Sequence, residues 1–494
     1  MLLLGIDLGT SSVKVSIVDG RTGHCICSTY YPEQEAEIES PCPGWAEQSP
    51  DKWWDHCRQA IKKLHSTRQY DPKNIRALGI AYQMHGLVML DKQGNSLRNS
   101  IIWCDSRAVP YGEKAFQSLG TDYCLHHLLN SPGNFTASKL AWVKENEPDI
   151  YEKAHKIMLP GDFISFKLTG EISSSISALS EGIFWDFKTR SVSGELLTHF
   201  GFDPSLLPQI KNVFSVHGLL QKQAALELGL EPGIPISYKA GDQPNNAFSL
   251  NILEPGEVAA NAGTSGVIYA VTETPETDPL SRVNQFAHVN YSNELERIGV
   301  LLCINGAGIS NRWIRSLAGD QFSYEVLNQK AAAIPAGADG LSFLPFGNGS
   351  ERMLENKYTG ASFQGIDLNK HTIGHLYRAG LEGVAFAFRY GLDIMRNCGL
   401  QPSLIKANHA NMFLSAVFTN SFVNATGIPV ELYQSDGSRG AALGAGIGAG
   451  LLTLKEAFAG FNPVRRIEPD NISKYTDLYE QWSSQLKSNL SAIK

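Results

Sequence analysis

Two segments far apart in the chain share one pattern: an apolar strand, a turn of glycine, threonine and serine, and a second strand. The first turn is Gly-Thr-Ser-Ser-Val at residues 9–13, and the second is Gly-Thr-Ser-Gly-Val at residues 263–267. After the first turn, Val13, Val15 and Ile17 alternate as in a strand with one buried face. An internal repeat of this kind predicts two similar domains, each of which opens with a β-hairpin.

Strands and helices alternate along the rest of the sequence. Ser49 followed by Pro50 is a helix start signal, and the apolar residues behind it fall on one helical face. We expect further strands at residues 77–82, 88–91, 234–239 and 404–407, and further helices at residues 374–395 and 439–454. The alternation favours an α/β fold with helices packed on the sheets. The predicted domains are an N-terminal one over residues 1–246 and a C-terminal one over residues 247–494.

The composition is that of an ordinary globular protein. Of the 494 residues, 43% are hydrophobic and 18% are charged, which excludes a disordered or collagen-like chain. The net charge of −7 gives no electrostatic footprint for nucleic acid or an anionic membrane, so neither is expected as a partner. The apolar residues before Asp7 fit an opening strand better than a signal peptide, and no stretch reads as a transmembrane helix. The 8 scattered cysteines predict free thiols in a reducing cytoplasm.

The turns of the two hairpins are candidate phosphate sites. Backbone N–H groups at a glycine turn form an anion-binding concavity, to which Thr10, Ser11 and Lys14 would add hydroxyl donors and a positive charge. Asp7 would supply the oxygen ligands that Mg²⁺ prefers. The alternative is a plain hairpin, since glycine, serine and threonine are ordinary turn residues. The glycines at 444–449 favour close packing of a helix over dinucleotide binding, and no P-loop motif is present in the sequence.

Two further acidic residues each allow a functional and a structural interpretation. Asp242 follows an expected strand, where it either caps the next helix or presents its carboxylate at the carboxyl edge of a sheet. Trp103, Asp105 and Arg107 also follow a strand. They either bind a polyol by stacking and charge-assisted hydrogen bonds or form a buried ion pair beside a tryptophan.

A series of segments, taken together and in order, resembles the FGGY family of carbohydrate kinases. They are Gly-Ile-Asp-Leu-Gly-Thr-Ser-Ser-Val-Lys at 5–14, Trp-Ala-Glu-Gln-Ser-Pro at 45–50, Gln-Met-His-Gly at 83–86, Ile-Trp-Cys-Asp-Ser-Arg at 102–107, Phe-Thr-Ala-Ser-Lys-Leu-Ala-Trp-Val at 135–143, Gly-Thr-Ser-Gly-Val at 263–267, Leu-Glu-Gly-Val at 381–384 and Gly-Ala-Ala-Leu-Gly at 440–444. Each segment is short, but the ordered set is specific for the family and extends over nearly the whole chain. The segment at 83–86 points to the branch of the family that acts on D-xylulose.

The resemblance implies two domains of ribonuclease H-like fold, related to actin and hexokinase, with ATP and a sugar in the cleft between them. It implies that Asp242 is the catalytic base and that Asp7 and Asp242 lie near a Mg²⁺ ion. The expected sugar contacts are Met84, His85, Trp103, Asp105 and Asp242. The expected ATP contacts are Thr10, Ser11, Lys14, Gly263, Thr264, Gly308, Ala410 and Asn411.

Two segments depart from the pattern of the family. Gln243 follows Asp242 where the family usually has asparagine, so the amide after the acid is longer. Residues 408–411 read Asn-His-Ala-Asn where the family usually has Gly-Gly-Gly or Gly-Gly-Ala. Without glycine, a left-handed backbone in this loop costs more, which affects close approach to the adenine.

The expected activity is transfer of the γ-phosphoryl group of ATP to the 5-hydroxyl of D-xylulose in the cytoplasm, with a homodimer as an expected assembly. One alternative is a kinase of the same family that acts on ribulose, another ketose such as fructose, or a polyol such as glycerol. A second is an actin-like ATP-binding protein without catalysis, and a third is a sugar-binding regulator. The presence of Asp7, Lys14 and Asp242 argues against the regulator.

Overall fold

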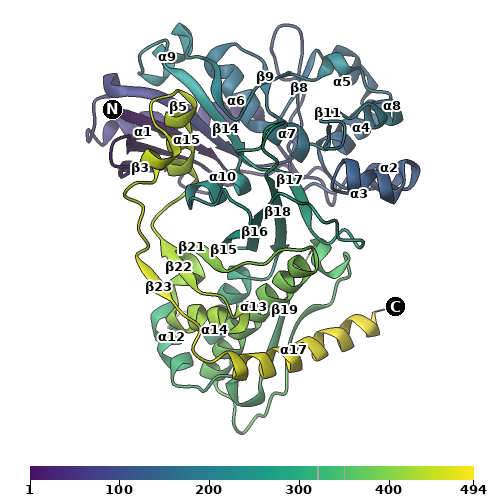
Figure 1. Ribbon diagram of the computed structural model, residues 1–494, viewed down its shortest axis with the longest axis vertical. Helices are drawn as coiled ribbons and strands as arrows, with labels where there is room; N and C mark the ends of the chain where they lie inside the picture. The colour runs from purple at the N-terminus through teal and green to yellow at the C-terminus, as the bar shows by residue number, and fades with distance from the viewer. Residues whose placement is uncertain (320–321, 350, 494) are drawn as a thin grey trace. The chain divides into compact units, whose positions relative to one another are not determined.

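The computed structural model describes residues 1–319, 322–349 and 351–493, and the chain divides into two compact units (Figure 1). Unit 1 consists of Met1–Leu253, Gln285–Gly299 and Ser435–Phe461, and unit 2 of Glu254–Asn284, Val300–Gln434 and Asn462–Lys494. The boundary expected after Asn246 falls inside helix α10 (Asp242–Ser249). Each unit takes segments from several parts of the chain, so a single cut does not separate them.

The central sheet of unit 1 has the strand order β13-β14-β5-β1-β2-β3. The bounds are β1 (Leu2–Leu8), β2 (Val13–Asp19), β3 (Cys25–Tyr31), β5 (Ile75–Tyr82), β13 (Phe214–Leu219) and β14 (Pro235–Gly241). β1 pairs antiparallel with β2 and parallel with β5, and β5 pairs parallel with β14. β1 and β5 are buried along most of their length, as their nearly continuous apolar sequence requires.

A second sheet, most of whose strands belong to unit 2, repeats this arrangement, with the order β17-β18-β16-β15-β21-β22-β23. The bounds are β15 (Glu257–Ala262), β16 (Gly266–Thr272), β17 (Asn284–Ala287), β18 (Ile298–Ile304), β21 (Leu404–Asn408), β22 (Val430–Tyr433) and β23 (Arg465–Ile467). β15 pairs antiparallel with β16 and parallel with β21, which pairs parallel with β22. The predicted repeat is therefore confirmed, and both units have the ribonuclease H-like α/β architecture.

Helices and short strand pairs complete both units. The helices of unit 1 are α1 (Pro50–Ser66), η1 (Pro72–Asn74), α2 (Val109–Leu119), α3 (Thr121–His127), α4 (Thr136–Asn146), α5 (Pro148–Lys153), α6 (Pro160–Thr169), α7 (Ile176–Glu181), α8 (Gly194–Phe200), η2 (Pro204–Leu206), α9 (Lys222–Leu228), α10, α15 (Gly437–Gly448) and α16 (Leu454–Ala457). Those of unit 2 are α11 (Gly308–Ala318), α12 (Tyr324–Ala332), η3 (Ala338–Gly340), η4 (Glu351–Leu354), α13 (Ile373–Asn397), η5 (Asn411–Leu414), α14 (Ala416–Thr426) and α17 (Ile472–Ala492). The short strands are β4 (Glu47–Gln48), β6 (Val88–Leu90), β7 (Ser100–Ile101), β8 (Lys156–Met158), β9 (Ser173–Ser174), β10 (Trp185–Asp186), β11 (Ser191–Val192), β12 (Gln209–Ile210), β19 (Ser342–Phe346) and β20 (Gly360–Gln364).

Helix α1 begins as the sequence predicts. Ser49 is its N-cap, where the side chain accepts a hydrogen bond from Lys52 N, and Pro50 is its first residue. The buried face of the helix consists of Trp53, Trp54, Cys57, Ala60, Ile61 and Leu64. The strands expected near residues 80, 237 and 405 and the helix expected at 374–395 are present as β5, β14, β21 and α13.

Helix α15 belongs to unit 1 although it lies late in the sequence, and it packs on β1, β5 and β14 (Figure 1). Strand glycines allow this close approach. A Cβ on Gly5 would lie 1.8 Å from a carbonyl oxygen of the helix, and a Cβ on Gly79 would lie 2.0 Å from another. From the helix side, a Cβ on Gly448 would lie 1.8 Å from Ser237 O. The prediction that the glycines at 444–449 serve helix packing is confirmed.

The predicted C-terminal end of this helix, residue 454, is wrong. The helix ends at Gly448, and Gly450 takes a left-handed conformation with φ of 69°. Leu451 then turns back, and its N–H donates to Gly446 O at 2.9 Å. A left-handed glycine just past the last turn is a common helix stop, and here it interrupts an apolar pattern that continues beyond it.

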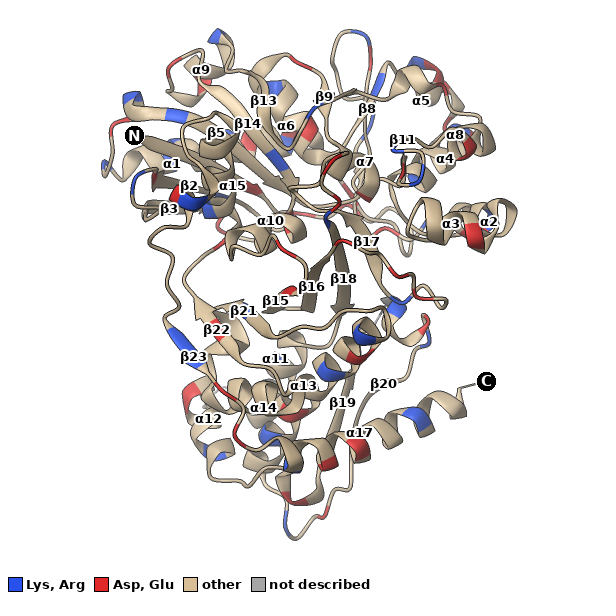
Figure 2. Ribbon diagram, viewed as in Figure 1, with Lys and Arg blue, Asp and Glu red and all other residues tan. Residues whose placement is uncertain are grey.

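Charged side chains are mixed over both units. Figure 2 shows lysine and arginine interspersed with aspartate and glutamate in each of them. The cysteines are free thiols. Within the part of the chain that the structure describes, no helix combines the length and the apolarity needed to cross a bilayer.

Candidate active site

Asp7 and Asp242 lie at the same edge of the unit 1 sheet. Asp7 is the last residue but one of β1, and Asp242 directly follows β14 as the first residue of α10. Both strands run parallel to β5, and the residues next to the two acids are both paired with Tyr82. The N-cap of α10 is Gly241, so Asp242 is not the cap that the sequence allowed. Its carboxylate stands at the carboxyl edge of the sheet, where α/β proteins bind ligands.

A third acid, Asp436, joins this edge from the late part of the sequence. It is the N-cap of α15, and its Oδ1 accepts a hydrogen bond from Arg439 N at 2.9 Å. Its Oδ2 accepts a hydrogen bond from Lys14 Nζ at 2.8 Å, across 422 residues of sequence. The helix starts against Asp7, because a Cβ on Gly437 would lie 2.2 Å from Asp7 Oδ2. Lys14, expected at the phosphates, is thus held by an acid that the sequence analysis did not identify.

The pKa of each of these three acids departs from its ordinary value. Burial, and then the charges of Asp242 and Asp436, raise the pKa of Asp7 from 3.8 to about 7, and Lys14 offsets part of this rise. Burial raises the pKa of Asp242 to about 6, although hydrogen bonds from Gln243 act in the opposite direction. Burial acts on Asp436 too, but Lys14 and local hydrogen bonds bring its pKa below the ordinary value. An uncompensated negative charge at this edge favours a bound cation.

In the absence of divalent metal, Asp7→Asn is expected to stabilise the protein at neutral pH by a few degrees in Tm. The pKa of Asp7 is raised in the folded chain, so its ionisation lowers stability as the pH rises from 3.8 through about 7. The neutral amide escapes this penalty. Thermal unfolding in EDTA should show a gap in Tm between variant and wild type. This gap should widen from pH 3.8 to about 7 and stay constant at higher pH. The exposed control Asp149→Asn should show no such gap, and a less stable Asp7→Asn protein at pH 8 would contradict the charge crowding.

The acids suit a magnesium ion held partly by substrate. Among the described residues, no group of three His, Cys, Asp or Glu side chains is placed to ligate a metal. Mg²⁺ is usually bound through one or two carboxylates, with water and substrate phosphates completing its shell. Asp7 and Asp242 supply such a pair of oxygen donors, and a cation would offset the burial and the repulsion that together raise the pKa of Asp7.

Thr10 connects the first Gly-Thr-Ser turn to a tryptophan. Its Oγ1 donates to Gln83 Oε1 at 3.1 Å and accepts from Trp103 Nε1 at 2.9 Å. Its carbonyl accepts from Gln48 Nε2 at 2.8 Å, and Gln48 Oε1 accepts from Gln83 Nε2 at 3.1 Å. Ser11, the next residue of the turn, is exposed. The expected ATP contact Thr10 and the expected sugar contact Trp103 therefore share one hydrogen-bonded group.

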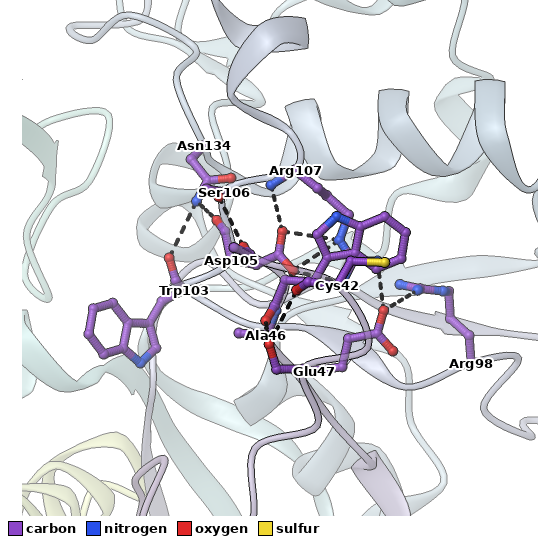
Figure 3. Close-up of polar contacts among 12 residues, drawn as sticks. Cys42, Ala46, Glu47, Arg98, Trp103, Asp105, Ser106, Arg107 and Asn134 are labelled. Atoms are coloured by element: carbon purple, nitrogen blue, oxygen red, sulfur yellow. Dashed lines mark hydrogen bonds and ion pairs between the residues drawn. The ribbon is translucent and has the colours of Figure 1, made fainter.

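Asp105 and Arg107 form the buried ion pair that the sequence left open as an alternative (Figure 3). Arg107 Nη2 lies 2.7 Å from Asp105 Oδ2, which also accepts from Ala46 N at 2.6 Å. The guanidinium stacks 3.7 Å over the ring of Trp45. Asp105 is 0% exposed, whereas Trp103 is 45% exposed, and a contact of either with a sugar stays a prediction.

Met84 and His85, two of the expected sugar contacts, are the second and third residues after the end of β5. Met84 is buried and packs against the end of β14, because a Cβ on Gly241 would lie 2.7 Å from Met84 Cγ. His85 is half-buried and has a positive φ of 63°. The structure thus brings the segment after β5 next to the strand end that carries Asp242.

Unit 2 contains a cavity of about 800 Å³ beside the second Gly-Thr-Ser turn. Four of the expected ATP contacts line it: Gly263, Thr264, Gly308 and Asn411. Gly308 begins α11 and donates its N–H to Gly263 O at 2.8 Å. A Cβ on Gly308 would lie 2.3 Å from that oxygen, so only glycine lets the helix start approach the turn so closely. The volume is within the usual range for small-molecule sites.

The loop at residues 408–411, which lacks the glycines typical of the family, contains one residue with a left-handed backbone, Asn411. This residue has a φ of 54°, a conformation that asparagine tolerates better than most non-glycine residues. It lines the cavity and lies 3.5 Å, through its Nδ2, from the Cβ position of Gly263. Ala410 precedes it and is not among the described residues that line the cavity.

Three residues near the Asp242 edge received no role from the sequence: Asp436, Glu181 and Lys139. For Asp436 a local signal exists, because an aspartate before Gly-Ser at the start of a Gly/Ala-rich segment is typical of a helix N-cap. For Glu181 and Lys139 no local pattern predicts the buried position or the partners that the structure shows.

Both halves of the chain match models of one protein family. The model for the N-terminal domain of the FGGY family of carbohydrate kinases matches residues 2–249, and the model for the C-terminal domain of that family matches residues 258–451.

Individual relatives match over most of the chain. A xylulose kinase from Haemophilus influenzae is 30% identical over 414 residues, which cover 82% of this chain and 82% of that protein. A xylulose kinase from Bacillus subtilis is 28% identical over 504 residues, which cover 98% of this chain and 96% of that protein. The crystal structure of xylulose kinase from Rhodospirillum rubrum superposes with a TM-score of 0.87 at 27% identity, over 99% of each chain.

Proposed function

Because the chain belongs to the FGGY family of carbohydrate kinases, we propose that it transfers the γ-phosphoryl group of ATP to the 5-hydroxyl of D-xylulose, forming D-xylulose 5-phosphate and ADP. The substrate class is supported by relatives named xylulose kinase that are 28% to 30% identical to this chain. The observation that carries the chemistry is the position of Asp242. Its carboxylate lies at the sheet edge beside Asp7, where its pKa is raised to about 6.

Asp242 acts as the base for the attacking hydroxyl. Phosphoryl transfer passes through a loose transition state, so the protein mainly positions the reactants and neutralises charge. A carboxylate with a pKa nearer neutrality than that of an ordinary aspartate is better suited to accept the hydroxyl proton late in the step. Asp242 therefore orients the 5-hydroxyl toward the γ-phosphorus and takes its proton as the new P–O bond forms.

Two sets of groups are suited to the negative charge of phosphates: the ammonium of Lys14 and the backbone N–H groups of the second Gly-Thr-Ser turn. Lys14 is held in place by Asp436 at 2.8 Å and is partly exposed, so its ammonium can reach a phosphate oxygen. Gly263 and Thr264 line the unit 2 cavity and present a glycine turn of the kind that binds anions. Mg²⁺, when bound by Asp7 and Asp242, would supply further charge neutralisation at the phosphates.

The exposed indole of Trp103 provides an apolar face for the sugar. Stacking of a sugar on a tryptophan needs an open ring that is fixed in orientation, and the bond from Trp103 Nε1 to Thr10 fixes this one. ATP and free thiols are both typical of a reducing cytoplasm, where we place the enzyme. A homodimer stays a prediction.

An assay of ADP release tests the function directly. Purified protein is given MgATP with D-xylulose, D-ribulose, L-ribulose, D-fructose, glycerol or xylitol, and the phosphorylated carbon of the product is identified by ³¹P and ¹³C NMR. We expect the highest kcat/KM with D-xylulose and phosphate on carbon 5. Turnover with none of these sugars would refute the kinase assignment, and a preference for ribulose or glycerol would refute the D-xylulose assignment alone.

A further inference from the structure

His85 adopts a left-handed backbone conformation, which non-glycine residues take up infrequently. Its φ of 63° lies in the left-handed region, which is strained for a residue with a side chain. Such a conformation persists only where the surroundings hold it, and it is concentrated at ligand sites. His85 is the third residue after β5, whose last residue pairs with the end of the strand that precedes Asp242.

Two residues from different helices hold both backbone groups of His85. Its N–H donates to Glu181 Oε1 at 3.4 Å, and its carbonyl accepts from Lys139 Nζ at 2.8 Å. Glu181 ends α7, and Lys139 lies in the middle of α4. The ring packs edge-on against Phe135 and tilted against Phe286, with centroids 4.6 and 5.4 Å away.

The imidazole is also fixed in one tautomer. Nδ1 of His85 lies 3.0 Å from the carbonyl oxygen of Glu181. Because a carbonyl oxygen only accepts, Nδ1 must carry the proton. In the neutral ring, Nε2 is then the nitrogen with the lone pair, and it can accept a hydrogen bond from a hydroxyl group.

Burying the ammonium group of Lys139 costs more free energy than a purely structural role would require. It is 0% exposed, and the ion pairs found among the described residues include none for it. A buried ammonium without a paired carboxylate is strongly disfavoured, and burial accordingly lowers the pKa of Lys139 from 10.5 to about 7. The contact that this residue makes in return is the hydrogen bond to the carbonyl of His85.

Glu181 links His85 to the strand end before Asp242. It is 1% exposed, and its Oε2 has no hydrogen-bond partner among the described residues. Burial raises the pKa of Glu181 well above 4.5. A Cβ on Gly241 would lie 2.6 Å from Oε2, which shows how closely Glu181 packs against the residue that precedes Asp242.

We propose that Lys139 and Glu181 are positioning residues that hold His85 in its left-handed conformation and in the Nδ1-protonated tautomer, so that Nε2 accepts a hydrogen bond from a hydroxyl of the ketose. The inference rests on the proposed function, because it takes the sugar site to be at His85. Both residues act through His85 and not on the reacting atoms. Their loss therefore weakens sugar binding and leaves the ATP side of the reaction unaffected.

The test compares two lysines of helix α4. Lys139→Met removes the bond to His85, whereas the control Lys144→Met removes bonds to the carbonyls of Phe200 and Gly201 at the end of α8. We expect Lys139→Met to raise the KM for D-xylulose by about tenfold or more, the equivalent of one buried hydrogen bond, with the KM for ATP unchanged within about twofold. Lys144→Met should leave both KM values within about twofold of wild type.

A double variant distinguishes positioning from general stability. In a His85→Gly background, Lys139 has no imidazole left to position, so adding Lys139→Met should change the sugar KM by less than about twofold. Glu181→Gln keeps an oxygen that can accept from His85 N, and it should raise the sugar KM less than Glu181→Leu does. If Lys139→Met does not fold, Glu181→Leu in the two backgrounds gives the same comparison.

The outcomes separate the inference from the function on which it rests. An unchanged sugar KM in Lys139→Met, or an equal rise with and without His85, overturns the positioning role while leaving the kinase assignment intact. Wild-type protein that phosphorylates none of the sugars overturns the proposed function itself.

Discussion

Replacing Asp242 by asparagine is expected to lower kcat with MgATP and D-xylulose by about 10²- to 10⁴-fold, the usual contribution of a general base. The amide can still orient the hydroxyl, but it cannot take its proton. Because burial raises the pKa of Asp242 to about 6, ionisation of this side chain lowers the stability of the folded state at neutral pH. The variant should therefore be at least as stable as wild type, which separates lost chemistry from lost structure.

The control for this prediction is Asp149→Asn. Asp149 also lies in the first turn of a unit 1 helix, α5, but it is exposed. We expect full activity from this control, measured as the initial rate of ADP release. An Asp242→Asn enzyme that retains more than about a tenth of the wild-type rate would show that the hydroxyl proton leaves by another route.

The second large effect is expected on stability, at the contact between α15 and the sheet. Gly5→Ala would place its methyl group 1.8 Å from a helix carbonyl oxygen, and Gly79→Ala would place one 2.0 Å from another. Backbone atoms of a helix cannot rotate away as a side chain can, so the helix must lift from the sheet. We expect each substitution to cost about 1–3 kcal/mol or more, as overpacking does, and the pair to prevent folding of unit 1.

Urea unfolding of the purified variants measures this effect. The matched control is Gly194→Ala, because a Cβ at that position meets no atom within 4 Å. It should change stability by less than about 0.5 kcal/mol. The two strand variants should also lose phosphoryl transfer, because a displaced α15 carries Asp436 away from Lys14. Wild-type stability in Gly5→Ala would mean that α15 does not lie so close to the sheet.

Periodicity and turn signals predicted most of the framework, since they are written in neighbouring residues. The alternation after Gly9 predicted the first hairpin, Ser49 and Pro50 predicted the start of α1, and the repeated Gly-Thr-Ser turns predicted two related sheets. The end of α15 was misplaced because the Gly/Ala/Leu pattern runs past Gly450, whose left-handed conformation stops the helix.

The candidate site was predicted in its motifs but not in its long-range contacts. Nothing near Lys14 in sequence indicates that its partner is Asp436, 422 residues away. The position of Asp105 could not be decided either, because the same Asp-Ser-Arg sequence suits an open polyol site and a closed ion pair. In the structure Asp105 accepts a hydrogen bond from Ala46 N and pairs with Arg107, which stacks on Trp45, so the buried ion pair is the arrangement found.

The discontinuous make-up of unit 1 bears on how a nascent chain matures on the ribosome. Residues 1–253 emerge without Ser435–Phe461, so the sheet face that α15 covers stays bare until roughly 200 further residues are translated, a delay of about 10–40 s. During that time Asp7 and Lys14 lack the counterpart that Asp436 provides, and apolar strands face solvent. We therefore expect a chain truncated before Ser435 to be inactive and prone to aggregation, because the apolar face of the sheet that α15 covers would stay exposed.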